Sequence, residues 1–185
     1  MRKSPCIYLR DQVLALRPTK QLKNDIDDEY FQRYKLVSTI YRLCAFLGWL
    51  ELYRQELTFQ QGSDGQRSKR LDDIIGQIRS DLADGQINEA PDWHIWRDTL
   101  IFREELRGIG ESLIETRGTT RTVMGYGRFL ELLEAETPSM TKHWAGVVTN
   151  FFIDVGYEQK DFRQTRLERL TTHLGELVEL LKDAK

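Results

Sequence analysis

The segment from Arg117 to Arg128 has the least ordinary combination of residues in the chain. It holds three arginines, three threonines and three glycines within twelve residues. Glycines let backbone amides converge, and the positive end of a helix attracts anions. The segment therefore predicts a binding site for phosphate or another anion, with these members: Arg117, Arg121, Gly125, Gly127 and Arg128. The spacing matches neither a Walker A loop nor a dinucleotide fingerprint, and the alternative interpretation is a glycine-containing connection between two helices.

Charged residues interrupt the most apolar run of the chain, Leu36 to Leu50, and the turn that follows it. At helical spacing Glu51 and Arg54 project into a leucine stripe and its flank, while Arg42 lies among aromatic residues. Buried charges require partners, and two carboxylates on the flank of a later helix are the expected ones. We predict a structural ion-pair network of Arg42, Glu51, Arg54, Asp98 and Glu105. The alternative is a polar pocket in which the carboxylates perform acid–base chemistry.

The remaining reactive residues do not form a recognisable catalytic or metal-binding motif. None of the three histidines has the partner spacing of a metal site, and carboxylate-bridged metal bundles use Glu-x-x-His motifs that the sequence lacks. There is no Gly-x-Ser-x-Gly elbow, and Cys44 lies in an apolar run as a small core residue. The sequence therefore predicts no metal, no cofactor and no catalytic residue.

The elements that would position these residues are helices. Apolar residues recur at helical spacing through most of the chain, and four prolines punctuate it. Turn clusters, glycines and caps set the expected boundaries. We expect helices over about 26–60, 68–82, 91–115, 122–134, 138–155 and 161–182, with Thr137 capping the fifth.

These expectations define the fold class and the domain organisation. The sequence predicts an all-α protein, an irregular antiparallel bundle of about five to seven helices around one long central helix. Residues 1–24 form a basic N-terminal segment, and residues 25–185 form a single helical domain.

Composition limits the classes of partner. Lys and Arg total 27 against 29 for Asp and Glu, a net charge of −2, so binding to nucleic acid is not expected. Two cysteines cannot build a disulfide framework, and the apolar run is too short and too charged to span a membrane. We therefore expect a cytoplasmic protein, with a weak electrostatic contact between segment 1–24 and anionic membranes as an alternative.

The function predicted from these observations is a non-enzymatic α-helical module for protein interaction or regulation. Its partner would be another protein or a second copy of itself. One alternative is a helical domain, ligand-binding or enzymatic, with an anion pocket near Arg117–Arg128. The other is a cytoplasmic domain tethered to a membrane by its N-terminal segment.

Overall fold

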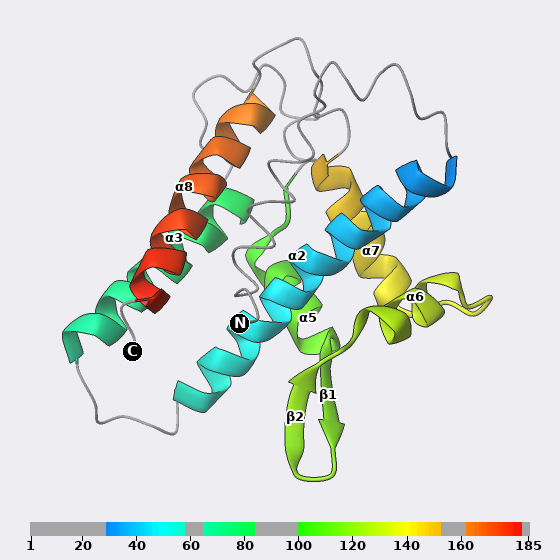
Figure 1. Ribbon diagram of the computed structural model, residues 1–185, viewed down its shortest axis with the longest axis horizontal. Coiled ribbons are helices and arrows are strands. Elements are labelled where there is room, and N and C mark those ends of the chain that lie inside the picture. The colour runs from blue at the N-terminus through cyan, green and yellow to red at the C-terminus, as the bar shows by residue number, and fades with distance from the viewer. Residues whose placement is uncertain (1–28, 58–64, 84–99, 153–161, 183–185) are drawn as a thin grey trace.

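The structure, a computed structural model, describes residues 29–57, 65–83, 100–152 and 162–182. Within these residues there are six helices and one two-stranded hairpin, which projects from the helices (Figure 1). In chain order the elements are α2 (Glu29–Leu57), α3 (Gly65–Ala83), α5 (Arg103–Ser112), β1 (Ile114–Arg117), β2 (Thr120–Val123), α6 (Tyr126–Glu134), α7 (Met140–Phe152) and α8 (Phe162–Lys182). The predicted helical fold class is confirmed, and none of the described helices is long and apolar enough to cross a membrane.

The longest helix, α2, is the central one. It packs mainly on α5 and also contacts α6, α7 and β2. Most apolar residues of the run from Leu36 to Leu50 are buried, but the side chain of Leu36 itself is 42% exposed. The hydroxyl of Tyr41 donates to the carbonyl oxygen of Met124 at 3.1 Å, and its ring meets Phe129 at 5.4 Å between centroids. These contacts fasten the start of α6 to α2.

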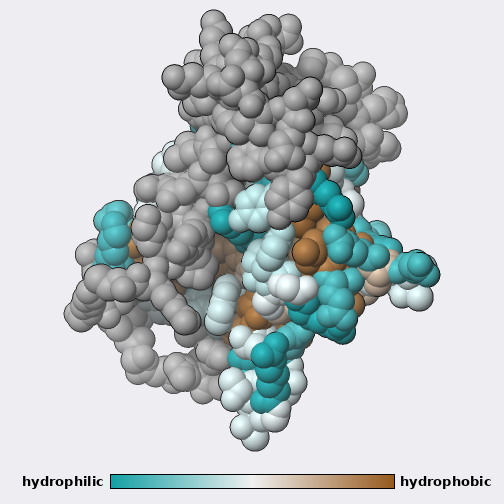
Figure 2. Space-filling view, turned by 45° about the vertical axis from the view of Figure 1, so that its right-hand side comes forward, coloured by the Kyte–Doolittle hydropathy of each residue, from teal (hydrophilic) through white to brown (hydrophobic). Residues whose placement is uncertain are grey.

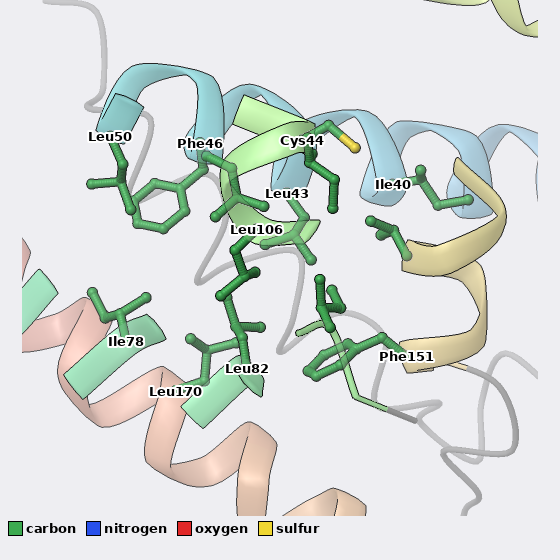
Figure 3. Packing of buried hydrophobic residues seen from close by; sticks show 14 of the residues in the cluster. Ile40, Leu43, Cys44, Phe46, Leu50, Ile78, Leu82, Leu106, Phe151 and Leu170 are labelled. Atoms are coloured by element: carbon green, nitrogen blue, oxygen red, sulfur yellow. The ribbon is translucent and has the colours of Figure 1, made fainter. Parts of the chain in front are cut away.

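The second helix pair is formed by α3 and α8, which lie side by side although they are far apart in the sequence (Figure 1). Leucines at helical spacing on α8 are buried from Leu167 to Leu177, whereas Leu181 is 42% exposed. Figure 3 shows that α3 and α8 share one core with α2 and α5. Residues Ile78, Leu82 and Leu170 of the first two helices face Leu43, Phe46 and Leu106 of the other two. The core is therefore continuous between the α3–α8 pair and the helices around α2.

The helix predicted over residues 91–115 is shorter in the described part of the chain, where both of its boundaries differ from the prediction. Residues 100–102 are not helical, because the amide of Ile101 donates to the carbonyl oxygen of Leu82 at 3.1 Å and so joins this segment to α3. Helix α5 begins only at Arg103, where the Glu105 carboxylate accepts the amide of Phe102 at 2.9 Å. At the other end the chain enters strand β1 at Ile114.

The hairpin replaces the helical start expected near Thr122. Strands β1 and β2 are antiparallel, and Arg117 pairs with Thr120 next to a turn at Gly118–Thr119. Gly118 has a φ of +62°, a conformation that glycine adopts without strain. Helix α6 therefore starts only at Tyr126, after an extended Gly125.

The cap predicted for the fifth helix is also wrong. Helix α7 begins at Met140, and its first turn is capped by Ser139 rather than Thr137. The Ser139 hydroxyl accepts the amide of Lys142 at 3.2 Å and donates to the carbonyl oxygen of Leu132 at 3.1 Å. Ser139 thus links the end of α6 to the start of α7, whereas the Thr137-Pro138 pair had predicted a helix start two residues earlier.

Candidate anion-binding cluster

The site is built where α2 and α5 cross at closest approach, and a glycine permits the crossing. A Cβ atom on Gly110 would lie 2.8 Å from the carbonyl oxygen of Leu47 and 3.0 Å from the Cβ of Glu51. Only a residue without a side chain fits there. The crossing brings the charged end of α2 near Arg107 and Glu111, in the second half of α5.

Glu51 is the buried anion at this crossing, with only 2% of its side chain exposed. Its Oε2 accepts Arg54 Nε at 2.9 Å, and its Oε1 accepts Arg54 Nη2 at 2.5 Å. Oε1 also accepts the side-chain amide of Gln55 at 2.6 Å. The hydrogen bond with Arg54 is the main cause that lowers the pKa of Glu51, against the opposing effect of burial. Glu51 therefore stays ionised.

The charge of this carboxylate interacts with three guanidinium groups from three helices. Arg54 comes from α2, Arg79 from α3 and Arg107 from α5. Arg107 also donates to Glu111 at 2.8 Å. We name Arg54, Arg79 and Arg107 the arginine cluster.

Arg79 differs from the other two members. Its side chain is half-buried, and within the described part of the chain it makes no hydrogen bond or ion pair. Burial is the main cause that lowers its pKa, and the charges of Arg54 and Arg107 lower the pKa further, while the charges of Glu51 and Asp72 oppose these effects. Glu51, Asp72 and Glu111 balance the charges of the three arginines, but the donors of Arg79 are unused by the described residues and are therefore open to an added anion.

The hydrogen-bonded system continues from Glu51 to the hairpin. The side-chain oxygen of Gln55, whose amide donates to Glu51, accepts a guanidinium N–H of Arg121. Strand β2 is thereby linked to the end of α2. Val123 strengthens this contact, since a Cβ on Gly48 would lie 3.2 Å from both of its methyl groups.

The predicted polar network is assembled only in part. Glu51 and Arg54 form the predicted pair, whereas the carboxylate of Glu105 accepts the amide of Phe102 at the start of α5. Arg42 is half-buried on α2, nine residues before Glu51, and is not among the donors to that carboxylate. Asp98 lies outside the described residues. The cations that accompany the pair, Arg79 and Arg107, were not among the predicted members.

The predicted anion site at Arg117–Arg128 is not gathered at one point. Strand register places Arg117 beside Glu115 on one face of the hairpin and Arg121 on the other. Arg117 pairs with Glu115 at 3.0 Å and Arg121 with Gln55, while Arg128 pairs with Glu131 at 2.7 Å along α6. Gly125 and Gly127 are exposed at the start of α6 with open space around them. The arginines are thus engaged in three separate contacts.

A second buried polar pair joins α3 to α8, and the sequence analysis missed it. Nδ1 of His173 lies 2.5 Å from Oδ2 of Asp81, which is nearly buried. Burial is the main cause that raises the pKa of Asp81, and the hydrogen bond with His173 opposes it. The available signal was Asp81 itself, an acid following the apolar face of its helix at Ile78.

The predicted membrane contact of residues 1–24 falls outside the described residues and stays a prediction. Among the described residues, no group of three or more His, Cys, Asp and Glu side chains is placed to bind a metal. No protein-family model matches the chain, and none of the curated proteins or solved structures compared with it is a significant match. The arginine cluster therefore has to be interpreted from its own chemistry.

Proposed function

We propose that this chain is a non-enzymatic α-helical interaction module, which binds an acidic group of a protein partner at the arginine cluster. The observation that carries the proposal is Arg79. Its half-buried guanidinium has no hydrogen-bonded anion among the described residues, so its donors are available to a carboxylate or phosphate from outside. Arg54 and Arg107 add two charges of the same sign nearby.

The geometry of the cluster favours a single anionic group on a protein over an extended polyanion. The three guanidiniums interact electrostatically with one buried carboxylate, which is a local group of charges, whereas nucleic acid needs a long basic surface to follow its phosphates. The chain has a net charge of −2, which offers no general attraction for a polyanion. An acidic side chain can instead accept the paired N–H donors of one guanidinium.

Titration with a hexaglutamate peptide, followed by isothermal calorimetry at low salt, tests the proposal. We expect the parent to bind the peptide and Arg79→Ala to bind it at least about fivefold more weakly, corresponding to roughly 1 kcal/mol for a lost charged hydrogen bond. Arg70→Ala is the matched control, since Arg70 is exposed on the same helix. Binding should weaken as salt is raised.

Two results would contradict the proposal. One is a parent protein that does not bind the peptide at low salt. The other is an Arg79→Ala variant that binds as well as Arg70→Ala while both keep the helical circular dichroism of the parent. Inorganic phosphate provides a second probe, because it should compete with the peptide for the same guanidinium groups.

A further inference from the structure

The hairpin stands out from the helical body, and its two strands have different surroundings (Figure 1). Strand β2 contacts α2 through Val123 and Arg121. Strand β1 pairs with β2 alone among the described residues, so its outer edge is unpaired there. Figure 2 shows this projection in teal to white, hydrophilic to neutral. An unpaired strand edge is a template for a strand from another molecule.

The register identifies which backbone groups face outward on that edge. The amide of Met124 donates to the carbonyl oxygen of Leu113 at 2.7 Å, so Leu113 is a hydrogen-bonding position toward β2. Hydrogen-bonding positions alternate along an antiparallel strand, which makes Glu115 and Arg117 the next two. The N–H and C=O groups of Ile114 and Thr116 therefore point away from β2.

The sequence of β1 is complementary to itself when two copies run antiparallel about Thr116. In that register Thr116 lies opposite Thr116 of the second copy, and their outward N–H and C=O groups form a reciprocal pair of hydrogen bonds. Glu115 then lies opposite Arg117 of the second copy, and the pairing is repeated by symmetry. Cross-strand pairs of opposite charge stabilise a sheet.

Neighbouring registers lack this complementarity. Pairing about Glu115 places two glutamates opposite each other, and pairing about Arg117 places two arginines opposite each other. Like charges directly opposite destabilise a sheet. Pairing about Ile114 would bring Glu115 against Leu113, which is fully buried inside its own copy. The charge pattern therefore selects the register about Thr116.

We propose that this chain forms a two-fold symmetric homodimer through the outer edge of β1, which joins the two hairpins into one four-stranded antiparallel sheet. This interface uses no residue of the arginine cluster. Strands of four residues cover much less than the roughly 1,200 Å² of a stable complex. The dimer should therefore be reversible and appear only as the protein concentration rises.

Sedimentation velocity over a concentration series, with charge variants of β1, tests the dimer. E115R alone and R117E alone place like charges across the interface, so each variant should be monomeric. An equimolar mixture of the two restores opposite charges on both sides and should form the heterodimer. The double variant E115R/R117E should dimerise as the parent does, which separates complementarity from a simple loss of either side chain.

A backbone variant gives an independent test. Thr116→Pro removes an outward N–H that the β1–β2 ladder does not use, so the hairpin should persist while the dimer is lost. Thr116→Val keeps the N–H and should dimerise. A parent that sediments as a monomer up to millimolar concentration would overturn the proposal, as would a dimer that survives E115R, R117E and Thr116→Pro. If Thr116→Pro loses the native circular dichroism, the charge variants decide alone.

Discussion

Glu51 keeps its charge in a nearly dry setting because Arg54 and Gln55 hold both of its oxygens. Its pKa is lowered in the folded state, so its ionised form stabilises the protein above the ordinary carboxylate range. That contribution is lost as the pH falls from about 4.3, the pKa of Glu in the unfolded chain, through the lower pKa of Glu51 in the folded protein. Acid should therefore weaken the α2–α5 crossing.

Removing the cation of this pair should be moderately destabilising. Arg54→Ala removes two of the three hydrogen bonds described for the buried Glu51 carboxylate and leaves the one from Gln55. Because 41% of the Arg54 side chain is exposed, water can replace part of the lost contact, and we expect a cost of about 1–2 kcal/mol. Urea unfolding measures it, with Arg70→Ala as a control that should change stability by less than about 0.5 kcal/mol. Equal stability of both variants would mean that Glu51 does not depend on Arg54.

Asp81 should show the opposite dependence on pH. Its pKa is raised mainly by burial. Its contribution to stability is therefore complete below about pH 3.9, the pKa of Asp in the unfolded chain, and is lost as the pH rises through the higher pKa of the folded protein. Asp81→Asn cannot titrate but can still accept the N–H of His173. The stability of this variant relative to the parent should therefore be higher at neutral pH than at pH 3, as followed by thermal melts. The reverse trend would show that attraction to His173 outweighs burial.

Pairs close in the sequence were the part of the site that could be predicted. Glu51 and Arg54 are three residues apart on one helix, and their intrusion into a leucine stripe marks them as partners. Arg79 was not predicted, because it joins the cluster only through tertiary packing, in which α3 contacts α5. Asp81 and His173 are 92 residues apart, and no local pattern indicates that they meet.

At the scale of elements, glycines distinguish close packing from open surface. Gly110→Ala should destabilise the fold by about 2 kcal/mol or more, because its Cβ would meet the backbone of Leu47, which cannot move aside. Gly76→Ala is the matched variant on α3, where nothing lies within 4 Å. It should stabilise by about 0.5–1 kcal/mol through helix propensity. Thermal unfolding of both variants checks the contrast, and similar effects would refute the close crossing.

The hairpin shows why the predicted helices were wrong over residues 114–123, where the structure has two strands. Residues 114–123 contain a valine, an isoleucine and four threonines around Gly118, which is a composition typical of strands with a turn. The helical periodicity before and after this stretch hid that signal. The boundaries of α8 agree closely with the prediction, since the helix expected over 161–182 is observed over Phe162–Lys182.

At the scale of the whole molecule, Cys44 reports on the integrity of the core. Its thiol is fully buried, and burial raises its pKa to about 12. In a Cys6→Ser background, the native protein should therefore react with a disulfide reagent only when the core opens. The labelling rate should rise with urea in parallel with the unfolding measured by circular dichroism. Rapid labelling without denaturant would contradict the described packing of α2.

Apolar periodicity predicted that the molecule is helical, but it did not predict which helices pack against each other. Periodicity identifies which face of α3 is buried, through Ile74, Ile75 and Ile78, and leaves open which helix covers that face. Many helices with a similar apolar stripe compete for it. The choice of α8 depends on side-chain shape and on the polar pair between Asp81 and His173, which only the packed structure displays.

The pairing of α3 with α8 also has a consequence for the order of events during synthesis. Helix α3 is translated about 80 residues before α8 begins, and at ordinary elongation rates this corresponds to roughly 4–16 s. During that interval Ile78 and Leu82 lack their final cover from Leu170 and Leu174, and the apolar face of α3 is available to chaperones or to premature contacts. The nascent chain therefore completes its core late, when a segment remote from α3 has left the ribosome.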